Sequence, residues 1–173
     1  MAFVLETERL ILREFIPSDL DALYDIMGDL ETMQIAYERT FSIEEVKQWM
    51  KRHDQRYETL GYGLFAVVLK DTSEVIGQCG LTWQPWKDKS VLEIGYLFSK
   101  KYWHHGYATE AAIACKEYAF SKLNEKSVYS IIRDTHKASI NVAIRNGMTK
   151  LDEMTKEFHG VEMNFDLYGV NKG

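Results

Sequence analysis

An α+β fold built on a mixed, mostly antiparallel central sheet is the class that this sequence predicts, and the order of its segments is the main reason. Strand-like runs and two helical stretches fill the first half, and a strand, a helix, a strand and a short helix follow after residue 90. Two further strand-like runs end the chain. Antiparallel strands follow one another through short turns, whereas parallel strands need a crossover, so this order places both kinds of pairing in one sheet. We expect about seven strands and about four helices in one domain over residues 1–173.

The first half of the chain alternates between strand and helix signals. Apolar runs bounded by turn residues predict strands over 5–15, 63–69 and 75–83, and apolar residues at helical spacing predict helices from Pro17 and over 42–57. Ser42 and Glu45 form a capping box, in which each side chain satisfies the other's backbone donor at the start of the second helix. The segment 29–41 is expected to be an irregular loop. Pro85 lacks an N–H group, so it is expected to prevent a simple continuation of the ladder between the strands over 63–69 and 75–83.

The second half of the chain contains the longest alanine-rich helical stretch. Its elements are expected over 91–98 (strand), 106–122 (helix), 127–133 (strand), 138–146 (helix), and near 149–158 and 161–168 (strands). Gly147 follows the short helix, at a position where glycine commonly ends a helix. His159 and Gly160 are expected to form the turn between the last two strands.

Composition argues against several classes of protein. The formal net charge of −5 argues against nucleic acid as the main partner, because phosphate binding needs a basic surface. Cys79 and Cys115 are too few for a disulfide framework, which favours a reducing cytoplasm, and no metal-ligand spacing is present. No apolar run reaches about 18 residues, and the start of the chain does not resemble a signal peptide. We therefore expect no membrane partner and no metal, in a cytoplasmic protein that is a monomer or a homodimer.

The segment from Tyr102 to Ala111 is the most informative part of the sequence. It connects the apolar run 91–98 to the alanine-rich helix and reads Tyr-Trp-His-His-Gly-Tyr-Ala-Thr-Glu-Ala. A strand, a short glycine-bearing loop and a helix direct free backbone N–H groups and the positive end of a helix toward one point. Because a side chain at Gly106 would stand between these N–H groups and a ligand, the glycine suits a phosphate or pyrophosphate. The alternative is that Gly106 only ends a loop before a helix.

Three groups of residues, in order along the chain, resemble the RimJ/RimL-like branch of the GNAT N-acetyltransferases, the ribosomal-protein-alanine acetyltransferases. They are Thr7–Arg13 with Pro17–Leu20, Glu93–Tyr96 with Tyr102–Ala111, and Ala138–Ser139 with Arg145–Met148. The resemblance is strongest over residues 7–150. It implies the GNAT fold and an acetyl-CoA-dependent N-acetyltransferase, in which an amine attacks the thioester directly and no covalent enzyme intermediate forms.

The resemblance assigns the coenzyme contacts to one strand, the loop that follows it and a short helix. The residues that it implies are Tyr96, Leu97, Phe98, Trp103, His104, His105, Gly106, Tyr107, Ala108, Thr109, His136 and Ser139. The strand backbone would pair with the pantetheine arm, and one of its N–H groups would face the thioester oxygen. Three of these residues depart from the family's pattern. The family has glutamine or arginine at the position of Trp103, often glycine at that of His104, and often asparagine at that of His136. The alternative is an ordinary core strand, which would be equally apolar.

Two residues are the catalytic candidates that the resemblance implies. Glu93 is an acid within an apolar strand, and burial would raise its pKa toward neutrality, as a base for the substrate ammonium requires. Many GNAT enzymes have a tyrosine four residues before the glycine that ends the last short helix, but this chain has Ala143 there. Ser139 lies one helical turn earlier and could donate a hydrogen bond to the leaving thiolate or the pantetheine instead. The alternatives are an exposed Glu93 paired with Lys89, and a Ser139 that only begins the helix.

The acceptor is expected to be a primary amine, either a small molecule or a protein N-terminus. The candidates for its binding wall are mostly large side chains, namely Met33, Tyr37, Trp83, Trp86, Phe158 and His159. Such residues more often belong to a core, and His53, on a polar helix with Lys51 and Arg52, is expected at the surface. A catalytically silent acyl-CoA-binding or sensor module is an alternative, since the usual tyrosine is missing. A flavin- or nucleotide-binding domain would instead carry its glycine loop after the first strand.

Overall fold

Eight strands form one sheet within residues 3–34, 39–158 and 160–173, the parts of the chain that the computed structural model describes. The strands are β1 (Phe3–Glu6), β2 (Leu10–Arg13), β3 (Leu64–Leu69), β4 (Val75–Trp86), β5 (Lys89–Phe98), β6 (Ser127–Arg133), β7 (Thr149–Phe158) and β8 (Val161–Asn171). They lie in the order β1-β2-β3-β4-β5-β6-β8-β7. Every neighbouring pair is antiparallel except β5 and β6, which are parallel. The predicted α+β class with a mixed, mostly antiparallel sheet is therefore confirmed.

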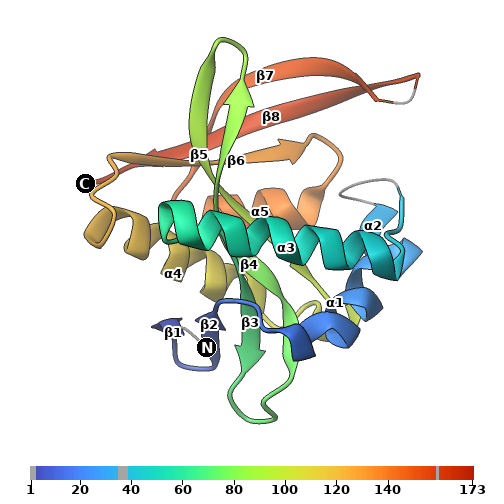
Figure 1. Ribbon diagram of the computed structural model, residues 1–173. Helices are drawn as coiled ribbons and strands as arrows, with labels where there is room; N and C mark the ends of the chain where they lie inside the picture. Colours follow the sequence, from blue (N-terminus) through green and yellow to red (C-terminus); the bar gives the residue numbers. More distant parts are fainter. Residues whose placement is uncertain (1–2, 35–38, 159) are drawn as a thin grey trace.

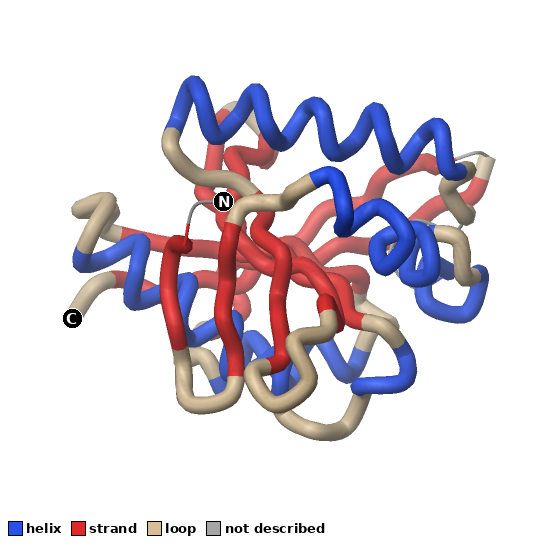
Figure 2. The backbone as a smooth tube through the Cα atoms, turned by 60° about the horizontal axis from the view of Figure 1, so that its bottom comes forward, coloured by secondary structure: helices blue, strands red, loops and turns tan. Residues whose placement is uncertain are grey.

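Five α-helices in the described part of the chain cover the two faces of this sheet. They are α1 (Leu20–Met27), α2 (Leu30–Gln34), α3 (Ile43–Leu60), α4 (Tyr107–Ser121) and α5 (Lys137–Arg145), and two short 3-10 helices are η1 (Pro17–Asp19) and η2 (Lys100–Tyr102). The long helix α3 crosses one face of the sheet, and α4 and α5 lie on the other (Figure 1, Figure 2). The β7–β8 hairpin forms one edge of the sheet (Figure 1). None of the described helices is both long and apolar enough to cross a bilayer.

Local sequence signals account for both ends of α3. At its start, Ser42 Oγ accepts a hydrogen bond from Glu45 N at 3.2 Å, and Glu45 Oε1 accepts one from Ser42 N at 2.9 Å. The predicted capping box is therefore confirmed. The helix ends at Gly61, whose φ of +83° is the left-handed conformation that favours glycine.

The structure differs from the predicted order of elements in three places. The expected first strand is two strands, because Thr7 N donates to Leu10 O at 2.9 Å and closes a tight turn between them. The short helix α2 lies in the segment that is expected to be an irregular loop. The strand β4 extends to Trp86, beyond the expected end at Trp83, although its ladder with β3 ends at Gly80, before Pro85. Beyond Gly80 this strand pairs with β5 alone, and a proline is tolerated on the open side of such a segment.

The pairing between β5 and β6 is confined to one point. Among the described residues, Glu93 and Tyr129 are the only partners in this parallel ladder, whereas β4 and β5 are paired from Gly77 to Trp86. Beyond Glu93 the two strands separate, so no strand of the described chain is paired with the second half of β5 on that side. This opening inside the sheet positions the site described below.

The strands β3 and β4 lie close together at Gly80. A Cβ atom at this position would lie 2.0 Å from Gly63 O and 2.6 Å from Leu64 Cα, which is too close for any side chain. Gly80 is also the partner of Gly95 in the β4–β5 ladder. A Cβ atom at Gly95 would meet its nearest neighbour at 3.7 Å, an ordinary van der Waals contact. Of these two paired glycines, only Gly80 is required by the packing of the sheet.

The Gly80→Ala substitution is expected to lower the free energy of unfolding by about 3 kcal/mol, because the backbone of β3 must move to admit the methyl group. Gly95→Ala is the matched control, and its cost should stay below about 1 kcal/mol, since its methyl group meets ordinary contacts. Urea denaturation followed by tryptophan fluorescence measures both values. Equal stability of the two variants would contradict the close approach of β3 and β4.

Candidate active site

Two side chains complete the ladder at the point where β5 and β6 separate. Ile131 N donates a hydrogen bond to Glu93 Oε2 at 2.8 Å, so a carboxylate takes the place that a backbone carbonyl has in a regular parallel ladder. Ser130 Oγ donates to Ile94 O at 3.0 Å. Buried backbone groups are costly when they are left unpaired. These two side chains therefore allow the strands to separate without leaving the N–H of Ile131 or the carbonyl of Ile94 unpaired.

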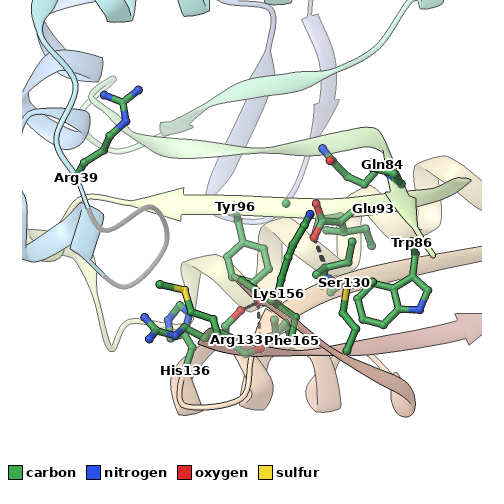
Figure 3. A pocket seen from close by; sticks show the side chains of 18 of the residues that line it. Arg39, Gln84, Trp86, Glu93, Tyr96, Ser130, Arg133, His136, Lys156 and Phe165 are labelled. Atoms are coloured by element: carbon green, nitrogen blue, oxygen red, sulfur yellow. Dashed lines mark hydrogen bonds between the residues drawn. The ribbon is translucent and has the colours of Figure 1, made fainter. Parts of the chain in front are cut away.

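A cavity of about 450 Å³ occupies the opening between the separated strands (Figure 3). Its walls come from β4, β5, β6, the start of α5 and the β7–β8 hairpin, and include Gln84, Trp86, Glu93, Tyr96, His136 and Ser139. Figure 3 shows Glu93 beside Gln84, while the ring of Tyr96 leaves the strand in another direction, toward His136. This follows from the alternation of side chains along β5, which directs Glu93 and Tyr96 to opposite faces of the sheet.

Burial gives Glu93 the acidity of a base that works at neutral pH. Removal of its carboxyl group from water raises its pKa from 4.5 to about 7, and the hydrogen bond from Ile131 N opposes part of this rise. The group is therefore close to half-ionised at neutral pH. A carboxylate with this pKa can take a proton from an ammonium group and release it again.

Tyr96 contacts the first turn of α5. Its hydroxyl lies 2.7 Å from Ser139 Oγ and donates to Ser139 O at 3.0 Å. Burial raises the pKa of Tyr96 above its ordinary value of 10, although the contact with Ser139 lowers it, so the phenol keeps its proton at physiological pH. His136 precedes the helix as its N-cap residue and lines the same cavity, and burial lowers its pKa. This end of the cavity therefore presents two hydroxyl groups and an uncharged imidazole.

The loop before α4 is held by a residue from the start of the chain. Arg9 Nε donates to Glu110 Oε1 at 2.7 Å, and Arg9 N and Thr7 Oγ1 donate to Glu110 Oε2 at 2.9 and 2.5 Å. Arg9 Nη1 also donates to His105 O at 3.0 Å. A Cβ atom at Gly106 would lie 3.4 Å from Arg9 Nη2. The guanidinium group thus fixes the loop and places a positive charge beside Gly106.

Gly106 is the N-cap of α4, and its φ of +80° is the left-handed conformation that favours glycine. It has no side chain to bond the first N–H groups of the helix. The N–H groups of Tyr107, Ala108 and Thr109 lie in the first turn and have no carbonyl partner within the helix. Together with Arg9 they form a helix end that suits an anion such as a pyrophosphate.

Aromatic residues stabilise the rest of this loop. Trp103 Nε1 donates to Phe98 O at 2.8 Å, and its ring packs against the core. The His105 ring lies with Nδ1 at 2.7 Å from Trp103 O and stacks on Tyr107, with 5.6 Å between the ring centroids. His104 is exposed and has a φ of +65°. Trp103 therefore anchors the loop to the end of β5.

The structure brings one part of the predicted site together and separates another. The residues that line the cavity are Trp86, Glu93, Tyr96, His136 and Ser139. Met33 is completely buried in the core, and Trp83 is exposed and donates its indole N–H to Tyr62 Oη at 2.8 Å, and neither residue lines this cavity. Tyr37, His159 and the side chain of Phe158 lie outside the described residues.

Sequence reasoning missed several residues of the site. The expectation that His53 lies at the surface was wrong, because α3 turns Trp49, His53 and Tyr57 toward the sheet and only 2% of His53 is exposed. The regular spacing of four residues between these three rings is a signal of a buried face. Glu110 lies within the motif around Gly106, but its partner Arg9 is 101 residues away, and no sequence pattern reveals that contact.

The amino-acid sequence is similar to a known protein family and to two bacterial proteins. A family model described as an acetyltransferase (GNAT) domain matches residues 9–149. An uncharacterized Bacillus subtilis (strain 168) protein, YkkB, is 31% identical over 144 residues, which are 83% of this chain and 84% of that protein. The uncharacterized N-acetyltransferase YnaD of the same organism is 28% identical over 144 residues, 83% of this chain and 81% of that protein.

Solved structures share the whole arrangement of helices and strands. An acetyltransferase (GNAT family) from Bacillus anthracis has a TM-score of 0.83 at 23% identity and covers 98% of each chain. RimL, a ribosomal L7/L12 α-N-protein acetyltransferase in complex with coenzyme A, has a TM-score of 0.80 at 17% identity, with 98% and 97% of the two chains covered. A spermidine N-acetyltransferase from Vibrio cholerae, in complex with coenzyme A and spermine, has a TM-score of 0.78 at 15% identity, with 95% and 96% covered. No group of three histidine, cysteine, aspartate or glutamate side chains that could hold a metal ion is present in the described part of this chain.

The Glu93→Gln substitution is expected to stabilise the protein, and to do so more strongly at pH 8 than at pH 5. The folded-state pKa of about 7 lies above the ordinary value of 4.5, so the folded state binds this proton more tightly. Ionisation of Glu93 therefore destabilises the fold increasingly as the pH rises from about 4.5 to about 7. Glutamine keeps an acceptor for Ile131 N without the charge, and the gain should reach on the order of 1–3 kcal/mol above pH 7.

Thermal unfolding of wild type and Glu93→Gln at the two pH values measures this difference. Glu58→Gln, at an exposed position on α3, is the control for the loss of one negative charge. A stability difference between wild type and Glu93→Gln that is the same at pH 5 and pH 8 would show that Glu93 ionises as an ordinary glutamate.

Proposed function

The chain belongs to the acetyltransferase (GNAT) family, and we propose that it moves the acetyl group of acetyl-CoA directly to a primary amine within a ternary complex. It is an acetyl-CoA-dependent N-acetyltransferase. The observation that carries the proposed mechanism is the opening between β5 and β6, with Glu93 on one face of β5 and Tyr96 with Ser139 on the other. Residues 1–173 would form one N-acetyltransferase domain.

Acetyl-CoA would bind from the α4 end of the opening. Its pyrophosphate suits the first N–H groups of α4, where Arg9 adds positive charge. The pantetheine arm would extend along the unpaired side of β5 and take the place of a neighbouring strand. The backbone groups of Leu97 face Gln78 on β4, and Phe98 O is bonded to Trp103, so this pairing would use the N–H and carbonyl groups of Tyr96 and the N–H of Phe98. The thioester supplies an activated acetyl group, and an N–H of the same strand would face its oxygen.

Glu93 would accept the proton of the substrate ammonium. It lies in the cavity wall where the strands separate, and the bond from Ile131 N fixes Oε2 and leaves Oε1 for the amine. With a pKa of about 7, the carboxylate is ionised often enough to act near neutral pH. The proton would pass to it directly or through a water molecule.

Tyr96 and Ser139 would stabilise the leaving thiolate. The usual position of the tyrosine on α5 is Ala143, which is buried and has no hydroxyl group. The thiol of coenzyme A, with a pKa of about 8.5 by analogy with cysteine, can leave without a proton. Since the phenol of Tyr96 has a raised pKa, it would turn its O–H from Ser139 O to the sulfur and donate a hydrogen bond instead of transferring its proton. Such a neutral hydrogen bond contributes about 1 kcal/mol.

The acceptor is an amine of a small molecule or of a protein N-terminus in this proposal. Both kinds occur among proteins of this fold, since RimL is named for a protein α-amine and the Vibrio cholerae enzyme for spermidine. A cavity of about 450 Å³ is large enough for a small amine together with the acetyl group. A silent acyl-CoA-binding module is the competing function, favoured by the missing tyrosine at Ala143.

Acetyl-CoA is expected to raise the thermal midpoint of the wild-type protein, and Gly106→Val should abolish this increase. A ligand that binds only the folded state stabilises it, and a valine side chain would obstruct the N–H groups of α4. Gly160→Val is the matched control, because Gly160 also has a φ of +80° but has nothing within 4 Å of its Cβ position. Both variants carry similar backbone strain, so a loss of the acetyl-CoA effect in Gly106→Val alone would not be caused by strain. An unchanged effect in Gly106→Val would remove the loop from the binding site.

The Glu93→Gln variant is expected to release coenzyme A at least about 100-fold more slowly than wild type with an acceptor amine, while the acetyl-CoA effect on the thermal midpoint persists. The deficit should shrink as the pH rises, because the amine then loses its proton unaided. A thiol-release assay with amines, amino acids and N-terminal peptides measures the rates. Full activity of the variant at neutral pH would exclude Glu93 as the base, and no amine-dependent release in wild type would favour the silent module.

A further inference from the structure

A second cavity, of about 210 Å³, lies between α3 and the sheet and meets the first cavity at Glu93. Its floor is formed by β4 and β5, with Gln78, Thr82, Glu93 and Leu97 on the same face of the sheet. Thr82 is the partner of Glu93, and Gln78 is the partner of Leu97. The floor therefore extends about 13 Å along the strands, from Glu93 at one end to Gln78 at the other.

The helix face that covers this floor is basic. Trp49, Arg52, His53 and Arg56 line the cavity from α3, at the spacing that places residues on one side of a helix. A helix face that packs on a sheet is normally apolar. Within the described part of the chain, neither Arg52 nor Arg56 forms an ion pair with a carboxylate. Two guanidinium groups thus border a cavity without a carboxylate partner.

His53 orients one of these guanidinium groups. Arg56 Nη1 lies 3.3 Å from His53 Nε2, and since arginine has no acceptor atom, Nε2 accepts this hydrogen bond. Burial, together with the charges of Arg56 and Arg52, lowers the pKa of His53 to about 3, so the imidazole stays neutral. The remaining ring nitrogen, Nδ1, then carries the proton, and it has no partner among the described residues.

Gln78 presents an unpaired donor from the floor of the cavity. Only 2% of this residue is exposed, and its Nε2 atom has no hydrogen-bond partner within the ranges that the structure describes. A buried donor without an acceptor is costly, so it indicates a ligand that supplies one. Glu93 is the one carboxylate among the described residues that line the cavity, and it lies at the opposite end of the floor.

We propose that this cavity binds the carboxylate of the acceptor, so that the enzyme acetylates amino carboxylates, small molecules with an amine and a carboxylate joined by a short carbon chain. The carboxylate would accept hydrogen bonds from Arg52, Arg56 and Gln78 Nε2, and guanidinium groups bind carboxylates in a fork geometry. The amine would then reach Glu93, where the second cavity meets the first. This assignment rests on the proposed acetyl transfer, because it needs the amine at Glu93 and the thioester in the opening between β5 and β6.

The charges of the two ends would also orient the acceptor. The positive guanidinium groups repel an ammonium group and attract a carboxylate, whereas Glu93 attracts the ammonium. A zwitterionic acceptor therefore has one favoured direction in the cavity, with its nitrogen toward the acetyl donor. A polyamine lacks the negative group and would place a second cation against Arg52 and Arg56.

The test compares each amino carboxylate with its own primary carboxamide, which differs only in the charge at the far end. The series includes α-amino acids and ω-amino acids of increasing chain length. Thiol release from acetyl-CoA gives kcat/KM for both members of each pair in wild type, Arg56→Gln and Lys51→Gln. Lys51 is an exposed cation of α3 that does not line the cavity, so it controls for the loss of one positive charge.

For the best carboxylate, the ratio of its kcat/KM to that of its carboxamide should fall about tenfold or more in Arg56→Gln and stay at the wild-type value in Lys51→Gln. Comparison of ratios removes the effect of the different amine pKa values in the two compounds. The same ratio in all three proteins, with measurable transfer, would overturn the carboxylate site while the acetyl transfer stands.

If no amine is acetylated, a binding measurement still tests the carboxylate site. The same amino carboxylates should raise the thermal midpoint of wild type and Lys51→Gln but not that of Arg56→Gln. This pattern without turnover would support the carboxylate site and reject the proposed transfer. Neither turnover nor a thermal effect of any amino carboxylate on wild type would overturn the carboxylate site as well.

Discussion

The hydrogen bond from Ile131 N to the carboxylate of Glu93 stands where β5 and β6 stop being neighbours, and the other features of the site depend on it. A parallel sheet cannot simply be pulled apart, because each separated strand would leave unpaired backbone groups inside the protein. Here Glu93 on β5 accepts a hydrogen bond from the backbone N–H of Ile131, and the hydroxyl of Ser130 on β6 donates one to a carbonyl of β5. Removal from water raises the pKa of this glutamate, although the bond from Ile131 N opposes part of the rise, so the residue that accepts this bond is also the candidate base.

Two further sets of contacts define the ends of the opening. At one end, Arg9 joins the first strands to the start of α4 through Glu110 and the carbonyl of His105, and this fixes the helix end that suits a pyrophosphate. At the other end, Tyr96 and Ser139 bring two hydroxyl groups together although the usual tyrosine position is Ala143. The cavity under α3 adds a third region, where, among the described residues, Arg56 has no carboxylate partner and Nε2 of the buried Gln78 has no acceptor. The proposed sites for the acetyl donor, the base and the acceptor amine thus all lie along one strand, β5.

The sequence predicts the fold class and the glycine-bearing loop before α4 well, because both depend on local patterns. The capping box at Ser42, the strand before Tyr102 and the glycine at the start of α4 are all visible within a few neighbouring residues. The contacts that complete the site join distant segments, such as Arg9 with Glu110, and no local pattern reveals them. The family resemblance implies a role for Tyr96 only through its backbone, because the direction of its side chain depends on the register of β5. The polar appearance of α3 concealed the burial of His53, because charged residues surround it in sequence while its own face lies against the sheet.

A crystal structure of the protein with coenzyme A tests the central claim most directly, namely that the opening between β5 and β6 holds the acetyl donor. The account predicts the pyrophosphate at the N–H groups of residues 107–109 and the pantetheine arm hydrogen-bonded to the backbone of Tyr96 or the N–H of Phe98. Its sulfur should lie inside the cavity, between Glu93 and the hydroxyl groups of Tyr96 and Ser139. Coenzyme A bound on another surface, with the opening between β5 and β6 left free of the pantetheine arm, would contradict the account.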